Sequence, residues 1–134
     1  MLSSMQGFGS NTERIGRSII DSALRVHSAL GPGLLEGTYE LCLSHELRRL
    51  GVATQQQVLI PIQYEDLRIE NGYRLDLLVE DSVVVELKAV EAVLPVHRGQ
   101  LLSYLRLGKF KLGFLLNFNV ARMRDGITRL VNGL

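Results

Sequence analysis

Apolar residues at helical spacing predict two helices in the first 50 residues of the chain. The first pattern follows Ser10-Asn11-Thr12-Glu13, which fits a capping box, and stops at Gly31-Pro32-Gly33, so we expect a helix over residues 12–30. The second pattern predicts a helix over residues 34–50, with Gly51 as its cap. The apolar positions that carry the two patterns are Ile15, Ile19, Ala23, Val26, Leu30, Leu43, Leu47 and Leu50.

From residue 55 onward the pattern of apolar and polar residues predicts strands and one further helix. Residues 55–64 are extended in character, and Pro61 within them indicates an edge position or a bulge. Two β-branched and apolar runs flank a turn at Glu80-Asp81-Ser82, which predicts a hairpin over residues 73–90. A helix over 95–107, a buried strand over 111–118 and a short strand over 127–131 follow. This order predicts an α/β or α+β fold, with helices packed on a sheet and the hairpin near its middle.

Two acidic residues and a lysine lie on the predicted hairpin. If its turn centres on Asp81, Asp76 lies opposite Glu86, and alternation places Lys88 on the same face. Directly opposed carboxylates repel each other, which favours either a proton or a bound divalent cation between them. The alternative is a solvated strand face with a weak ion pair between Glu86 and Lys88. The opposite face is expected to hold Leu75, Leu77, Val79, Val83, Val85 and Leu87, whereas Leu78 and Val84 share the acidic face and cover part of it.

Two helix faces offer further candidate groups. Glu36 lies in the first turn of the second helix, where it either stabilises the helix dipole or supplies a metal ligand. Gln100 and Tyr104 share one face of the third helix, so they either contact phosphates and bases or are surface polar residues. His97 lies close beside them and either shares these contacts or is a helix-start histidine without a ligand. His27 and His45 have no partner at metal spacing and are expected to be structural or solvated.

Composition narrows the class of protein. The 134 residues, 46% hydrophobic and 22% charged, predict one globular domain over residues 12–134 after a flexible extension over residues 1–11. No apolar run reaches membrane-spanning length and no signal-peptide pattern is present, so we expect a cytoplasmic location. Cys42 is the only cysteine, so no internal disulfide is possible, and we expect it to be a small buried hydrophobe.

Charge is unevenly distributed along the sequence. Residues 1–97 carry 8 Lys/Arg against 13 Asp/Glu, a net charge of −5. Residues 98–134 carry 7 Lys/Arg against Asp125 alone, a net charge of +6. An acidic centre beside a basic flank suits a site that handles metal and phosphate together.

Six short motifs in order give the chain a resemblance to a known family. The sequence resembles the GxxExxY family, a branch of the PD-(D/E)XK nuclease superfamily, from about residue 12 to residue 132. The motifs are Val26-His27-Ser28-Ala29-Leu30-Gly31-Pro32, Gly33-Leu34-Leu35-Glu36-Gly37-Thr38-Tyr39, Gly72-Tyr73-Arg74-Leu75-Asp76-Leu77-Leu78-Val79, Val85-Glu86-Leu87-Lys88-Ala89-Val90-Glu91, Gln100-Leu101-Leu102-Ser103-Tyr104-Leu105 and Leu115-Leu116-Asn117-Phe118.

The resemblance implies a mixed sheet flanked by helices and a metal site. It implies that Asp76 and Glu86 bind Mg²⁺ or Mn²⁺ and that Lys88 positions the attacking water. It also implies that Glu36 matches the helical glutamate of exonuclease-like members. Gln100 and Tyr104 would form the family's Gln-x-x-x-Tyr element. Leu75 departs from the superfamily pattern, which has proline before the aspartate.

Two functions from different classes follow from these observations. The first is metal-dependent phosphodiester hydrolysis of DNA, or less favoured RNA, with the Leu87 carbonyl as an additional metal ligand. Gln100, Tyr104, Arg98 and Arg106 would then hold the nucleic acid strand. The second is a nucleic-acid-binding or protein-binding module that keeps the nuclease fold without catalysis. A homodimer is compatible with either function.

Overall fold

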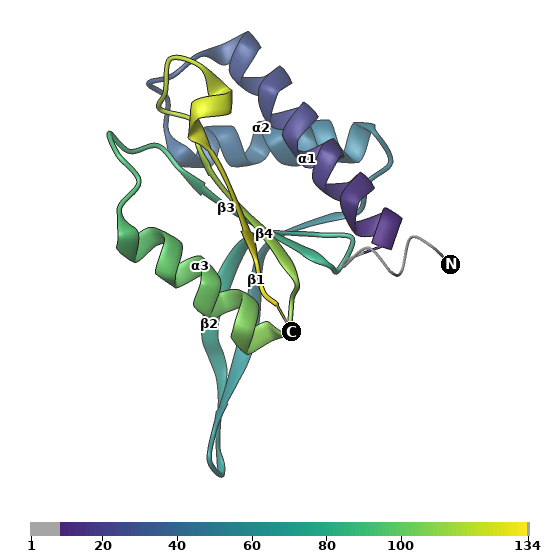
Figure 1. The fold of residues 1–134 in the computed structure, drawn as a ribbon, viewed down its shortest axis with the longest axis vertical. Coiled ribbons are helices and arrows are strands. Elements are labelled where there is room, and N and C mark those ends of the chain that lie inside the picture. Colours follow the sequence, from purple (N-terminus) through teal and green to yellow (C-terminus); the bar gives the residue numbers. More distant parts are fainter. Residues whose placement is uncertain (1–8, 134) are drawn as a thin grey trace.

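Three helices pack against the two faces of one five-stranded sheet in the computed structural model, which describes residues 9–133 (Figure 1). Helices α1 (Gly9–Leu30) and α2 (Glu36–Arg49) cover one face, and α3 (Pro95–Gly108) covers the other. The predicted order of helices and strands is confirmed, and the fold is α+β. Among the described residues, no helix has the length and apolarity needed to cross a bilayer.

The strands lie in the order of the sequence. They are β1 (Thr54–Tyr64), β2 (Leu67–Val79), β3 (Val83–Lys88), β4 (Leu112–Asn117) and β5 (Ile127–Val131), with a short 3₁₀ helix, Met123–Gly126, before β5. Only β3 and β4 pair in parallel, because α3 connects them as a crossover. The other pairs are antiparallel: short turns join β1 to β2 and β2 to β3, and residues 118–126 join β4 to β5. The sheet is therefore mixed, with the β2–β3 hairpin at its centre.

The central strands are buried on both faces, which explains their nearly continuous apolar sequences. Side chains on one face, including Val85 and Phe114, pack with α1 and α2 in a first core cluster. On the other face, Val84 and Leu115 pack with Leu101 of α3 in a second core cluster. β3 is thus held by packing on both of its faces, which gives Glu86 a rigid support.

Two details of the sequence-based prediction were wrong. Leu75 packs in the second core cluster with Leu78 and Val84, not on the face of Leu77, because the alternation of side chains is interrupted at Asp76. In addition, α1 begins at Gly9, so Ser10 lies within the helix and the predicted capping box does not mark its start. Residues 1–8 of the expected extension lie outside the described residues.

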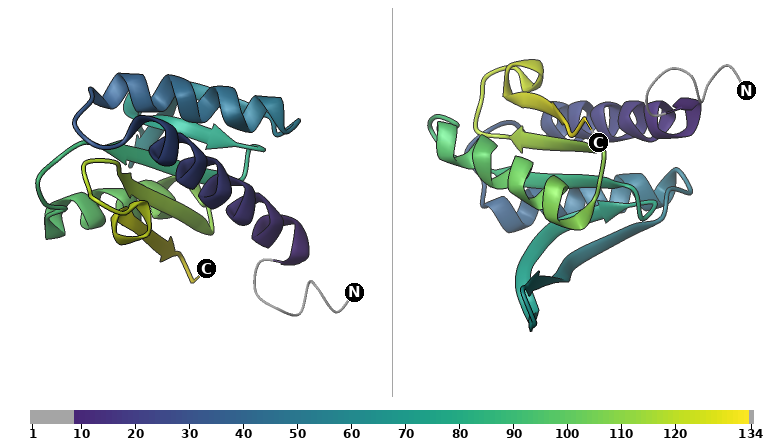
Figure 2. Two further views of the ribbon diagram at one scale, coloured as in Figure 1. Left: turned by 90° about the horizontal axis from the view of Figure 1, so that it is seen from above. Right: turned by 60° about the horizontal axis from the view of Figure 1, so that its bottom comes forward.

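The β1–β2 hairpin extends well beyond the rest of the sheet (Figure 2). As Pro61 indicates, β1 is an edge strand, and its register with β2 shifts between Ile60 and Ile62. We call the distal part of this hairpin, residues 62–72, the arm.

Candidate active site

Asp76 and Glu86 lie opposite each other where β2 and β3 separate. The last ladder pair is Leu77 with Val85, so backbone pairing between the strands stops one residue before the two acids. Side chains replace it: the Asp76 N–H donates to Glu86 Oε2 at 2.9 Å, and the Leu87 N–H donates to Asp76 Oδ2 at 2.9 Å. Each carboxylate is therefore fixed by the backbone of the neighbouring strand, side by side with the other.

The two carboxylates share a poorly solvated position. Burial, with the nearby charge of Asp76, raises the pKa of Glu86 to about 8. Burial also raises the pKa of Asp76, although the hydrogen bond from the Leu87 N–H acts in the opposite direction. The pair consequently favours a proton or a cation at neutral pH.

Glu36 and Lys88 act electrostatically on this pair. The pKa of Glu36 is raised by burial and by the charge of Asp76, whereas Lys88 lowers it. Lys88 also lowers the pKa values of Asp76 and Glu86, so the four groups expected from the sequence lie within one electrostatic neighbourhood. Among residues 9–133, however, no three Asp, Glu, His or Cys side chains are grouped closely enough to form a metal cage by themselves.

Hydrogen bonds fix the backbone around Lys88. Its carbonyl accepts from the Phe118 N–H at 2.9 Å, at the end of β4. The buried side chain of Asn117 then holds Val90 twice: its amide donates to the Val90 carbonyl at 3.0 Å, and its oxygen accepts from the Val90 N–H at 3.1 Å. The backbone position of the lysine is therefore set by β4.

Tyr39 organises the loop that leads into α2 and thereby places Glu36. Its hydroxyl donates to the Gly31 carbonyl at 2.6 Å and accepts from the Leu34 N–H at 3.1 Å. Its ring is fully buried and stacks on Phe118 with the centroids 4.5 Å apart. Gly31 and Gly33 have positive φ, a conformation that glycine adopts without strain.

Removing the Tyr39 hydroxyl is expected to lower the free energy of unfolding by about 1–2 kcal/mol. In Tyr39→Phe two hydrogen bonds of the loop are lost, while the stacked ring remains. Tyr64→Phe, at an exposed ring on the arm, is the matched control and should leave stability unchanged. Urea unfolding of both variants measures the difference, and an unchanged midpoint in Tyr39→Phe would contradict the assigned role.

Glu40 and Gln57 lie at the site but are not among the predicted site residues. Glu40 is buried on α2 and raises the pKa of Asp76. The Gln57 amide donates to Glu40 Oε1 at 2.7 Å and also bonds the Asp76 carboxylate, so it joins the two acids. The spacing of Glu36 and Glu40 gave a signal, since residues four apart share a helix face. Gln57 gave none, because its placement depends on a positive φ within a strand.

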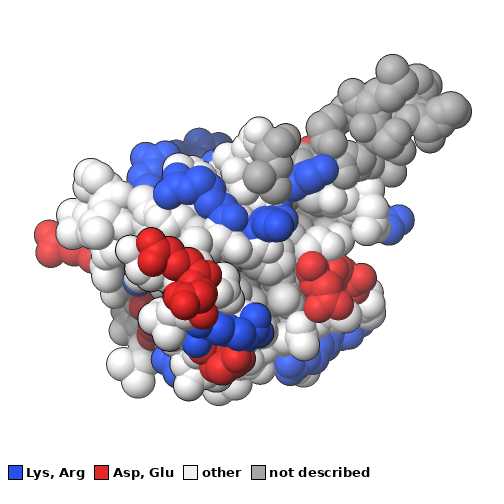
Figure 3. Space-filling model, turned by 90° about the horizontal axis from the view of Figure 1, so that it is seen from below, with Lys and Arg blue, Asp and Glu red and all other residues white. Residues whose placement is uncertain are grey.

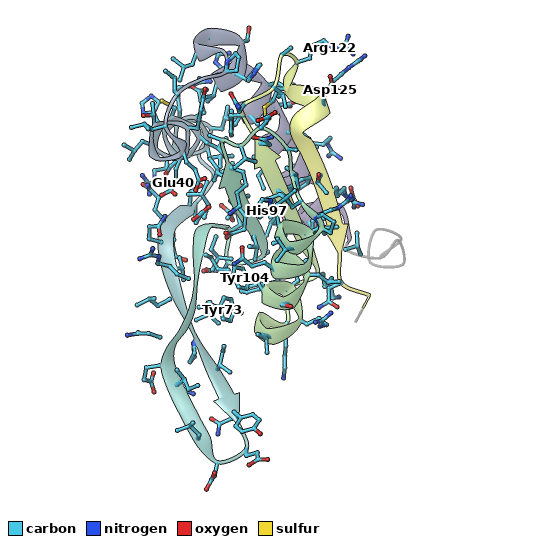
Figure 4. All side chains as sticks on the ribbon, turned by 90° about the vertical axis from the view of Figure 1, so that its left-hand side faces the viewer. Glu40, Tyr73, His97, Tyr104, Arg122 and Asp125 are labelled. Carbon is cyan, nitrogen blue, oxygen red and sulfur yellow. The ribbon has the colours of Figure 1, made fainter. Side chains whose placement is uncertain are left out.

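Tyr104 lies beside the acidic pair, whereas the predicted basic contacts lie elsewhere on α3. Burial and the charges of Glu86 and Asp76 raise the pKa of Tyr104, and its ring stacks on Tyr73 at 4.5 Å. Figure 4 shows Tyr104 beside Tyr73, where α3 lies against β2. Gln100 is exposed one turn before Tyr104. Arg98 and Arg106 are also exposed, and they lie about 120° and 160° around the helix from Tyr104.

Two of the three histidines have structural roles. His97 Nδ1 accepts from the Leu94 N–H at 3.0 Å and so caps the start of α3. His27 is buried and its Nε2 donates to the Val120 carbonyl at 2.7 Å, which confirms a structural role. His45 is exposed, and Cys42 is a half-buried free thiol packed against the first core cluster.

Comparison with known proteins identifies the fold and its family. No curated protein and no solved structure matches the chain. A family model described as the PD-(D/E)XK nuclease superfamily matches residues 13–130, a segment that contains every helix and strand of the sheet except the first turn of α1 and the last residue of β5. With its mixed sheet and its opposed acids at the end of the central hairpin, this chain belongs to the PD-(D/E)XK nuclease superfamily.

Proposed function

We propose that this protein is a metal-dependent phosphodiester hydrolase that acts on DNA, with RNA as the less favoured substrate, and that it belongs to the GxxExxY branch of its superfamily. Membership of a nuclease superfamily supports a nucleic acid substrate. The observation that carries the proposal is the reciprocal bonding of Asp76 and Glu86, which holds two buried carboxylates together beside Lys88.

The donor set fits Mg²⁺ or Mn²⁺. Mg²⁺ usually keeps several waters and takes one or two protein carboxylates, so a site without three clustered acids is compatible with it. Asp76 and Glu86 would hold the ion, with the Leu87 carbonyl and Glu36 as further oxygen ligands. When bound, the ion would lower the pKa of a coordinated water and stabilise the charge that develops on the phosphate.

The protein's own groups would orient the water and the strand. Lys88, on a backbone fixed by β4, would orient or deprotonate the attacking water and add positive charge near the phosphate. Gln100 and Tyr104 would contact the strand next to the scissile bond, and Arg98 and Arg106 would bind phosphates farther along α3.

Cleavage assays with pure protein test the proposal. We expect DNA cleavage with Mg²⁺ or Mn²⁺, none with a chelator, and a loss of more than about 100-fold in Asp76→Asn. Asp81→Asn, which removes an exposed carboxylate from the β2–β3 turn, is the matched control and should cleave normally. Absence of cleavage on every DNA and RNA substrate, or full activity in Asp76→Asn, would refute the hydrolase.

The absence of a three-acid group among the described residues favours one alternative, a binding module without catalysis. Calorimetric titration with Mn²⁺ separates the two functions. Binding that Asp76→Ala abolishes supports the hydrolase, whereas salt-sensitive nucleic acid binding without metal binding supports the module. The cytoplasmic location and the homodimer expected from the sequence stay predictions.

A further inference from the structure

Three exposed apolar side chains and the half-buried Ile62 form one face of the arm. The register pairs Ile62 with Ile69 and Tyr64 with Leu67, and residues two apart share a face, so all four lie together. Tyr64, Leu67 and Ile69 are 64%, 55% and 41% exposed. A two-stranded ribbon is marginally stable alone, and a contiguous exposed apolar face of this kind is typical of an interaction site.

The arm is firmly joined to the body at its base. Ile62 packs against the second core cluster, and a Cβ added at Gly72 would overlap the Ile62 side chain, so the two strands approach closely there. Below this point the Tyr73 hydroxyl donates to the Tyr104 carbonyl at 3.1 Å, which ties β2 to the last turns of α3. The apolar face therefore continues the core outward in a fixed direction, beyond the cover of α3.

The charges on the arm disfavour nucleic acid as its partner. Residues 62–72 carry three carboxylates and one arginine, and that arginine, Arg68, is paired with Glu70 at 2.6 Å. Glu65 and Asp66 remain exposed at the tip, where they would repel phosphates. Exposed Arg106 and Lys109 lie at the other end, on the last turn of α3 and just after it. Figure 3, which views the molecule from below and so looks onto the tip of the arm, shows basic side chains gathered along one edge and acidic side chains, with basic ones among them, across the middle.

We propose that the arm is the interface of a homodimer, in which two arms pack apolar face to apolar face about a two-fold axis. The arm spans roughly 20 Å from Tyr73 to Leu67, so antiparallel packing brings each acidic tip to the base of the partner's arm. Glu65 and Asp66 then approach the partner's Arg106. Because a two-fold interface repeats every contact, this charge pairing occurs twice.

A second copy fits the arm better than it fits another apolar surface of the molecule. That surface is an open groove between α1 and α2 with a volume of about 370 Å³, lined by Val26, Ala29, Leu30, Leu41 and Cys42. The charged groups at its rim satisfy each other, since Arg25 pairs with Glu46 at 3.3 Å. The acidic residues at the tip of the arm and the basic residues beside its base lie at opposite ends. An antiparallel copy brings these opposite charges together. The interface shares Arg106 with the proposed strand contact, but association is measured without nucleic acid, so the two proposals can fail separately.

Sedimentation of the full chain over a range of concentrations tests the interface. We expect the wild type to dimerise and Tyr64→Glu to raise the dimer dissociation constant at least about tenfold. Leu41→Glu, at an equally exposed leucine of the α1–α2 groove, is the matched control and should leave association unchanged. Circular dichroism of each variant checks that the monomer fold is intact.

Charge reversal gives a second, independent readout. Asp66→Arg should weaken association, and adding Arg106→Glu to the same chain should restore it, because the pair is then inverted. A wild type that stays monomeric, or a Leu41→Glu variant that weakens association as much as Tyr64→Glu, would overturn the proposal. Loss of DNA binding in Tyr64→Glu with unchanged association would assign the arm to nucleic acid instead.

Discussion

Glu86→Gln is expected to stabilise the metal-free fold at high pH. The pKa of Glu86 is raised by burial from 4.5 to about 8, so between these values the folded state keeps a proton that the unfolded chain has released. Wild-type stability is therefore fully present below about pH 4.5 and falls until about pH 8, whereas glutamine has no charge to lose. The stability difference between variant and wild type should grow over this range to the order of a few kcal/mol.

The same substitution should abolish metal-dependent cleavage. Glutamine keeps one oxygen for the Asp76 N–H but lacks the negative charge that a divalent cation requires. We expect cleavage to fall by more than about 100-fold, and Mg²⁺ to stabilise the wild type but not the variant. A functional residue that destabilises the metal-free fold is the expected signature of a binding site.

Urea unfolding between pH 5 and pH 9, with chelator and then with Mg²⁺, measures both effects. Glu91→Gln removes an exposed carboxylate from the loop after β3 and serves as the matched control. A stability difference that does not change with pH would contradict the raised pKa. Full cleavage activity in Glu86→Gln would remove this carboxylate from the metal site.

Local sequence patterns predicted the β2–β3 hairpin and the opposition of its two acids. The turn residues and the two strand runs placed Asp76 opposite Glu86, and the structure confirms that they lie opposite each other, one position beyond the last ladder pair. Both signals act over fewer than 20 residues, so no knowledge of the rest of the fold was needed. The buried strand β4 was equally clear, because its near-continuous apolar run matches burial on both faces.

The surroundings of the acidic pair could not be predicted in the same way. Leu75 does not lie on the expected face, because strand alternation is interrupted at Asp76. Gln57, which lies opposite Asp76 on β1, has a positive φ. Glu40 reaches the site only because α2 packs beside β1, a contact between elements that the sequence does not specify locally. Side-chain positions that depend on a strained strand or on helix–sheet packing are set by tertiary structure, which overrides local pattern.

Lys88→Met is expected to lower the rate of cleavage by about 10²–10⁴-fold at saturating metal. The substitution removes the group that orients or deprotonates the water and leaves both carboxylates in place. The fold should tolerate it, because the backbone of Lys88 is held by Phe118 and the following segment by Asn117. Single-turnover assays with increasing Mg²⁺ separate this loss in rate from a loss of metal binding.

The charge of Lys88 has a second effect, which distinguishes its two roles. Because the lysine lowers the pKa values of Glu86, Asp76 and Glu36, its removal should raise all three and shift metal binding to higher pH. Lys88→Arg is the matched control: it keeps the charge, so metal binding should follow the wild-type pH profile, but it cannot act as a base. If arginine restores the full rate, Lys88 acts by charge alone, and if methionine cleaves like the wild type, Lys88 has no part in the reaction.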